Sequence, residues 1–207
     1  MSHYFATPDS AEVRHEVPAT IWGRTYSFVS ANGVFSASRL DPGTTQLFRL
    51  AGPPADRPAR FLDLGCGFGP IAVALAVACP QARVDAVDPN ARALALTRLN
   101  AERAGVADRV RVFAPDDQPD TSSYDEIWSN PPIRIGKANL HALLERWLPR
   151  LTPAGHATMV VAKNLGADSL HTWLTEHGWA TTRLGSANGF RVFTIASGGV
   201  SALTVLP

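Results

Sequence analysis

A short apolar segment followed by closely spaced glycines constrains this chain more than any other feature of its sequence. Arg60–Leu64 is apolar enough for a buried strand, Gly65, Gly67 and Gly69 follow it, and residues 71–79 form an apolar run of helical length. Glycine permits backbone torsions closed to other residues and lets a ligand approach the main chain. A helix start adds unpaired N–H groups and positive dipole potential. The segment therefore predicts a strand–loop–helix unit with a ligand site at the loop.

The residues around the loop narrow the kind of ligand. A second apolar segment, Arg83–Val87, ends at Asp88, and Pro89 suits a first helical position. An acid at this place accepts hydrogen bonds from a ribose diol. The Gly-x-Gly-x-Gly spacing differs from the dinucleotide pattern, and Asp63 would repel a pyrophosphate but suit an ammonium or sulfonium group. The pattern favours a positively charged nucleoside cofactor over a dinucleotide.

The tetrapeptide Asn130-Pro131-Pro132-Ile133 follows the apolar segment Tyr124–Ser129. The two prolines fix their backbone torsions and remove two amide donors, so nearby carbonyl groups point in set directions as acceptors. The Asn130 side chain adds another carbonyl acceptor. These groups suit both hydrogens of a flat exocyclic amino group. Alone, the tetrapeptide suits an ordinary proline-rich turn equally well, and the upstream loop and acids favour the functional reading.

These motifs, taken in order, resemble those of a known enzyme superfamily. Residues 63–69, Asp88 and residues 130–133 are similar to the motifs of class I S-adenosylmethionine-dependent methyltransferases that modify planar amino groups. Residues 32–36 (Asn-Gly-Val-Phe-Ser), residues 39–44 and Leu47 resemble more particularly the methyltransferase small domain family, which includes ribosomal RNA guanine-N2 methyltransferases C and G. The resemblance covers residues from about 33 to 193.

The resemblance implies a cofactor, S-adenosylmethionine, and a set of site residues. It implies catalytic roles for Asn130 and Pro131, and a target site formed by Pro132, Ile133, Phe35 and Arg134. The cofactor-binding residues that it implies are Asp63, Gly65, Cys66, Gly67, Gly69, Asp88, Pro89, Asp116 and Asn130. The sequence leaves Asp116 and Asp117 both open as the acid near the adenine, and the family alignment favours Asp116.

The implied reaction is methyl transfer by direct displacement at sulfur, with guanine N2 of ribosomal RNA as the expected acceptor. The same chemistry on a protein glutamine, an adenine or a small molecule is the alternative, and a non-catalytic cofactor-binding module is a third possibility. Relatives often carry an aromatic residue at the position of Ile133, where it stacks on the target ring. We therefore expect either that another ring supplies the stacking, from Phe35, Phe5 or Tyr4, or that base binding is weaker.

The alternation of strand and helix patterns predicts an α/β fold: a doubly wound, mostly parallel seven-stranded sheet. The expected strands are residues 60–64, 83–87, 109–114, 124–129, 157–162, 179–184 and 190–196, and the last two should form an antiparallel hairpin. The expected helices are residues 71–79, 89–104, 138–151 and 168–177, with an earlier short helix capped by Asp41. Residues 11–18 and 24–30 predict an N-terminal hairpin. We expect an extension, residues 1–58, packed on a core of residues 59–207 as one structural unit.

Composition sets limits on partners. The 207-residue chain has a formal net charge of +1, so no global basic field attracts a polyanion. Arg134 and Lys137 directly follow the Asn-Pro-Pro motif, and the N-terminal segment contains Arg14, Arg24 and Arg39. These basic residues suit either RNA phosphates or an ordinary solvated face.

The remaining features predict absences and leave one question open. The two cysteines and six histidines show no metal spacing, and we expect no metal. No apolar run reaches the ~18 residues of a membrane span and no secretory signal is visible, so we expect a cytoplasmic protein. The family resemblance implies RNA as the partner, as ribosomal RNA or a ribosomal subunit. The sequence does not indicate an oligomeric state.

Overall fold

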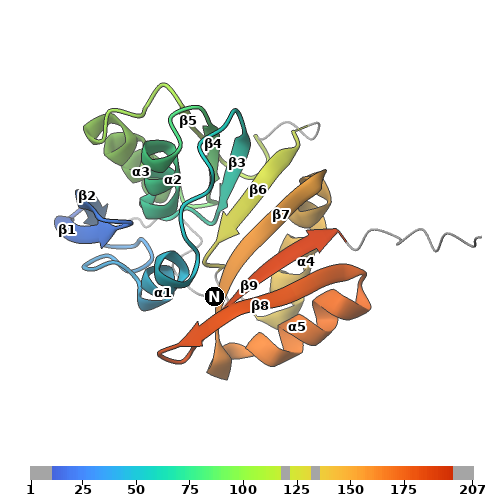
Figure 1. The fold of residues 1–207 in the computed structure, drawn as a ribbon. Coiled ribbons are helices and arrows are strands. Elements are labelled where there is room, and N and C mark those ends of the chain that lie inside the picture. Colours follow the sequence, from blue (N-terminus) through green and yellow to red (C-terminus); the bar gives the residue numbers. More distant parts are fainter. Residues whose placement is uncertain (1–10, 118–121, 132–135, 198–207) are drawn as a thin grey trace, which may run out of the picture.

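A seven-stranded sheet forms the centre of the molecule (Figure 1). The computed structural model describes residues 11–117, 122–131 and 136–197. The strand order is β5-β4-β3-β6-β7-β9-β8. The strands are β3 (Arg60–Leu64), β4 (Arg83–Val87), β5 (Val110–Phe113), β6 (Tyr124–Ser129), β7 (Leu151–Ala162), β8 (Trp179–Ala187) and β9 (Phe190–Ser197). The first five pair in parallel, and β9 lies antiparallel between β7 and β8. The predicted fold class is confirmed.

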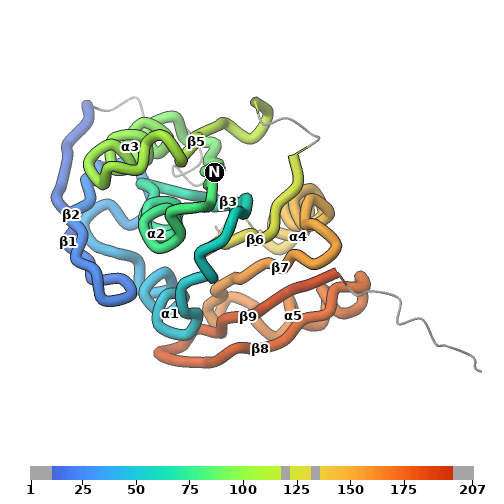
Figure 2. Tube along the Cα trace, turned by 45° about the horizontal axis from the view of Figure 1, so that its top comes forward, coloured from blue at the N-terminus to red at the C-terminus, as the bar shows by residue number. Residues whose placement is uncertain are grey.

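Helices cover both faces of this sheet (Figures 1 and 2). The first face carries α1 (Pro42–Leu50), α2 (Pro70–Ala78) and α3 (Ala91–Arg103), whose apolar side chains share one buried cluster with Phe61 of β3. The second face carries α4 (Lys137–Trp147) and α5 (Ala167–Glu176), which pack in another cluster with Leu62. Since successive side chains of a strand point to opposite faces, the continuously apolar β3 serves both clusters.

A two-stranded hairpin, β1 (Arg14–Ile21) and β2 (Arg24–Ala31), lies alongside α3 (Figure 2). The buried side chain of Asn100 joins the hairpin to the core. Its Oδ1 accepts from the N–H of Val29 at 2.7 Å, and its Nδ2 donates to the carbonyls of Val29 and Phe68 at 2.8 and 2.7 Å. One side chain of α3 therefore holds both the hairpin and the loop between β3 and α2.

Several predicted boundaries were wrong for identifiable reasons. Strand β1 continues through Pro18, because in this two-stranded sheet proline can occupy an edge position. Helix α3 begins at Ala91, since the Asn90 side chain accepts from the N–H groups of Arg92 and Ala93 and so caps the helix after Pro89. Helix α4 ends at Trp147, before a 3₁₀ turn that contains Pro149, which has no N–H to donate.

We expect Asn100→Ala to lower the free energy of unfolding by about 2–3 kcal/mol, because it leaves three buried backbone groups without partners. Urea denaturation measures the change. Glu102→Ala, on the exposed side of the same helix, serves as the matched control and should change stability by no more than ~0.5 kcal/mol. Equal unfolding curves for the two variants would contradict the role assigned to Asn100.

Candidate functional site

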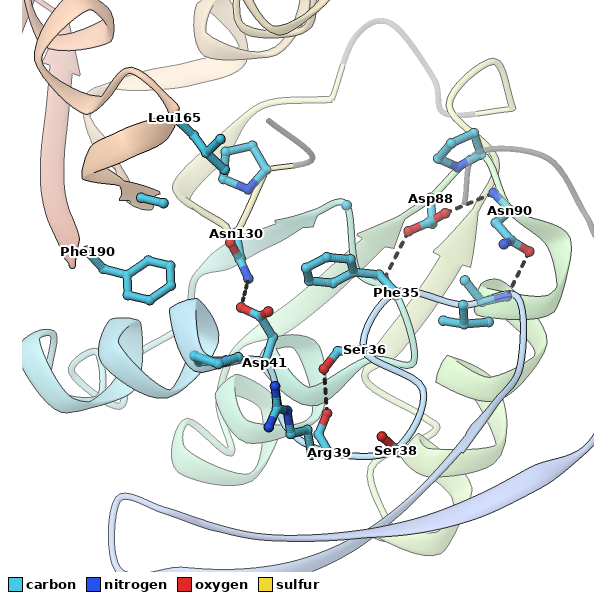
Figure 3. A pocket seen from close by; sticks show the side chains of 18 of the residues that line it. Phe35, Ser36, Ser38, Arg39, Asp41, Asp88, Asn90, Asn130, Leu165 and Phe190 are labelled. Carbon is cyan, nitrogen blue, oxygen red and sulfur yellow. Dashed lines mark hydrogen bonds between the residues drawn. The ribbon is translucent and has the colours of Figure 1, made fainter. Parts of the chain in front are cut away.

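A cavity of about 580 Å³ opens where the parallel strands end (Figure 3). Its lining comes from the segments that follow β3, β4, β6 and β7, from the start of β9 and from the stretch before α1. Because parallel strands bring their carboxyl ends to one edge of a sheet, segments distant in sequence meet there. The volume is within the range of small-molecule sites.

The glycine-rich loop forms one wall and is held to the end of β4. The N–H groups of Gly65 and Cys66 both donate to the carbonyl of Val87, at 2.9 and 3.0 Å. The N–H of Gly67 donates to Asp88 Oδ2 at 3.0 Å, with Gly67 in a left-handed conformation (φ 57°) that favours glycine. The loop is therefore fixed against the acid expected to contact a ribose.

Asp88 lies at the cavity surface with its carboxylate partly enclosed. Its Oδ1 accepts from the N–H of Asn90 at 2.9 Å. Burial raises the pKa of Asp88, and the hydrogen bonds from Asn90 and Gly67 oppose this rise. Asn90 in turn donates from Nδ2 to the carbonyl of Gly33 at 2.8 Å, which ties the stretch before α1 to this wall.

Asp63 lies beneath the loop and is fully buried, outside the cavity lining. Its Oδ2 accepts from the N–H of Ala72 in the first turn of α2 at 2.9 Å, whereas its Oδ1 has no hydrogen-bond partner among the described residues. Burial raises the pKa of Asp63 to about 8. The unpartnered Oδ1 lies beside the ligand loop, where a cationic group of a ligand would favour the ionised form that burial opposes. These residues therefore fit the ammonium-bearing cofactor that the motifs imply.

Asn130 and Pro131 form the opposite wall, at the end of β6. The Asn130 side chain donates from Nδ2 to Asp41 Oδ1 at 2.7 Å and to Thr44 Oγ1 at 3.0 Å (Figure 3 shows the first bond). Asp41 and Thr44 belong to the cap and first turn of α1. The stretch before α1 thus contacts both walls of the cavity.

Two aromatic side chains, Phe35 and Phe190, also line the cavity. Phe35 is 45% exposed, and Figure 3 shows it between Asn130 and Asp88. Phe190, at the start of β9, is half-buried. The Phe190 ring and Asn130 Oδ1 both lie next to Gly43: a Cβ added to this glycine would be 3.1 Å from the ring and 3.2 Å from the amide oxygen. The ring is therefore close to the amide.

The structure brings most of the predicted site residues together. Gly65, Gly67, Asp88, Pro89, Asn130, Pro131 and Phe35 line the cavity. Cys66 belongs to the loop, but its side chain is buried, and burial raises the pKa of its thiol. Gly69 is the N-terminal cap of α2. Asp116 is outside the lining: its side chain is 91% exposed and pairs with Arg146 at 3.1 Å. Pro132, Ile133 and Arg134 lie outside the described residues.

Sequence reasoning missed several lining residues, above all Asn90, Asn164, Leu165 and Phe190. The Asp-Pro-Asn order at positions 88–90 carried a usable signal for Asn90, because asparagine is a strong helix cap. Phe190 has no such signal in the sequence, since only the pairing of β9 with β7 brings it to the cavity.

In the described part of the chain no cluster of three or more candidate metal ligands occurs. No helix there is long and apolar enough to cross a membrane.

Comparison with known proteins identifies the family. Residues 25–194 match the family described as methyltransferase small domain. The chain is 30% identical over 171 residues to the Bacillus subtilis protein YbxB (81% of this chain and 84% of that one). It is 34% identical over 194 residues to ribosomal RNA small subunit methyltransferase C of Chromohalobacter salexigens (90% of this chain and 54% of that one).

A solved structure shares the fold. The 16S rRNA N2 G1207 methyltransferase of T. thermophilus, in complex with AdoMet and guanosine, matches with a TM-score of 0.77 at 24% identity, over 92% of this chain and 52% of that chain. The chain therefore spans about half the length of the two ribosomal RNA methyltransferases.

The family match defines a methyltransferase domain, whose fold is shared with a solved enzyme that holds AdoMet. The chain belongs to the methyltransferase small domain family, and the resemblance inferred from its motifs is confirmed.

The raised pKa of Asp63 predicts a pH dependence of stability. Between the ordinary value of 3.8 and about 8, the folded chain holds a proton that the unfolded chain releases. This contribution to stability is complete below the ordinary pKa and is lost as the pH rises through about 8. We expect the wild type to lose stability relative to Asp63→Asn across this window, in urea unfolding without ligand.

Asp117→Asn, which changes an exposed acid, is the control and should follow the wild-type profile. If Asp63→Asn also followed it, Asp63 would titrate in the folded chain as it does in the unfolded one.

Proposed function

We propose that this protein transfers a methyl group from S-adenosylmethionine to a planar exocyclic amino group, namely guanine N2 in ribosomal RNA. The observation that carries this proposal is one cavity with the glycine loop and Asp88 on one wall and Asn130 and Pro131 on the other. A nucleoside cofactor on the first wall and an amino acceptor on the second would lie next to each other, as transfer of a group between two substrates requires.

The wall around the glycine loop suits the methyl donor. Gly65 and Gly67 offer close approach to the main chain, Asp88 suits the ribose diol, and Asp63 suits the ammonium group. Asp116 remains a predicted contact of the adenine amino group. S-adenosylmethionine supplies an activated methyl group and its own leaving group, so the protein mainly binds and orients.

The opposite wall suits the acceptor. An amino group conjugated with a purine ring is a poor nucleophile because its lone pair is delocalised into the ring. Acceptance of its two N–H groups by Asn130 Oδ1 and the Pro131 carbonyl favours pyramidal nitrogen and localises that pair. No strong general base is needed, because the proton leaves after the methyl group arrives.

One arginine at the cavity and the names of similar proteins favour RNA as the substrate. Arg39 lines the cavity mouth and forms no ion pair in the described part of the chain, so its guanidinium is available to a phosphate. A target base in a duplex must rotate out of the stack, at a cost of a few kcal/mol. The names of the similar ribosomal RNA methyltransferases point to the same substrate class.

Substrate fractionation tests the proposal. Purified protein and donor with a labelled methyl group are incubated with separated ribosomal subunits, free rRNA, total cell protein and small-molecule extract. Label in rRNA guanine supports the proposal. Label in protein glutamine, in adenine or in a small molecule would redirect the substrate, and cofactor binding without transfer to any fraction would favour a binding module.

We expect Asn130→Ala to lower kcat by ~10²-fold or more, since it removes a preorganised polar group at the reacting centre. The cofactor Kd, measured by calorimetry, should change little, because the loop and Asp88 are intact. Wild-type turnover by this variant would locate the amino-binding group elsewhere.

We expect Phe190 to supply the stacking surface that Ile133 lacks. Stacking is worth ~1–3 kcal/mol per base, so Phe190→Leu should raise the KM for the methyl acceptor by ~5-fold to 150-fold. Phe190→Tyr keeps the ring and should leave this KM close to that of the wild type. Equal KM values for the leucine and tyrosine variants would assign the stacking to Phe35 or to another ring.

A further inference from the structure

The cap of helix α1 holds the one side chain on which the proposed chemistry most depends. Both N–H bonds of the Asn130 amide are used within the protein: Nδ2 donates to Asp41 Oδ1 at 2.7 Å and to Thr44 Oγ1 at 3.0 Å. Thr44 is only 4% exposed, so water competes little for its hydroxyl. The amide nitrogen is thus anchored from two positions of α1.

These contacts also fix which end of the amide is free. Asp41 Oδ1 accepts from the N–H groups of Gly43 and Thr44, at 2.7 and 3.2 Å, as the cap of α1. A carboxylate oxygen accepts hydrogen bonds and cannot donate them, so it attracts a donor and repels another acceptor. The nitrogen of Asn130 must therefore face Asp41, and Oδ1 of Asn130 is left as the acceptor.

Gly43 contributes to the contact between Asp41 and Asn130. A Cβ at this position would lie 2.9 Å from Asp41 Oδ1 and 3.2 Å from Asn130 Oδ1. Contacts this short oblige one of the two polar groups to move. The glycine therefore allows the cap carboxylate and the amide to approach each other.

We propose that Asp41 and Thr44 are positioning residues for methyl transfer: they orient Asn130 so that its oxygen, and never its NH₂ group, meets the acceptor amino group. This inference rests on the proposed function. The terminal torsion of asparagine is broad and roughly two-fold. Without the two partners the amide also adopts the reversed orientation, in which two donor groups oppose each other.

The arrangement makes the stretch before α1 part of the acceptor site. Asp41 lies about ninety residues before Asn130 in the chain, and it belongs to a segment that also lines the cavity through Phe35 and Arg39. Folding of this segment onto the core therefore completes the proposed catalytic group. An isolated core that begins at β3 would lack the orienting partners.

Substitutions at Asp41 and Thr44 separate the orientation of Asn130 from the capping of helix α1. Serine is a good N-terminal cap but is too short to keep the contact with Asn130, so Asp41→Ser should retain the wild-type unfolding midpoint. We expect its kcat to fall ~10-fold or more while the cofactor Kd is unchanged. Thr44→Val removes the buried hydroxyl at similar volume and should act in the same direction, and Thr44→Ser should recover most of the lost turnover.

The neighbouring threonine provides the matched control. Thr45 is exposed and its hydroxyl donates to the main-chain carbonyl of Asp41, away from Asn130. Thr45→Val should keep wild-type turnover. If Asp41→Ser and Thr44→Val also keep it while Asn130→Ala loses activity, the positioning role is overturned and the proposed function stands.

A second measurement needs no activity. In ¹⁵N-labelled protein, both side-chain amide hydrogens of Asn130 should exchange slowly with solvent in the wild type and faster in Asp41→Ser. Equal exchange rates in the two proteins would overturn the anchoring. If the wild type transfers no methyl group to any amine, the proposed function fails, and the exchange rates still decide whether the amide is anchored.

Discussion

Parallel pairing of three neighbouring strands is the constraint on which the site depends. Strand β3 pairs in parallel with β4 on one side and with β6 on the other, so all three end at the same edge of the sheet. The glycine loop, Asp88 and Asn130 each follow one of these strands. Their proximity therefore follows from main-chain hydrogen bonds in the sheet, and the side chains themselves need supply only local orientation.

That edge is stabilised by contacts that serve folding and site geometry together. The carbonyl of Val87 accepts from two N–H groups of the glycine loop, Asp63 binds the N–H of Ala72 near the start of α2, and Asn100 joins the loop residue Phe68 to the N-terminal hairpin. A rigid frame of this kind suits a reaction in which positioning and electrostatics supply most of the catalysis. Burial of Asp63 within this frame opposes ionisation of its carboxyl group.

The segment before α1 links the two halves of the cavity. Asn90 holds its Gly33 carbonyl on the Asp88 wall, whereas Asp41 and Thr44 hold Asn130 on the other wall. The family-specific motif at residues 32–44 therefore has a structural account: it binds both walls and presents Phe35 and Arg39 to the space between them. The glycine loop alone provides only the donor half of such a site.

The sequence by itself determined the helices and strands and the class of chemistry, because each depends on residues within a short stretch of the chain. Apolar runs of strand or helix length, the glycine loop and the Asn-Pro-Pro motif each lie within a short stretch, and the bounds of β3, β4 and β6 agreed with prediction. The tertiary structure decided the contacts between distant stretches: the partners of Asn130, the place of Phe190 beside it and the exposure of Asp116. Those depend on strand order and helix packing, which bring together residues whose relation has no local pattern in the chain.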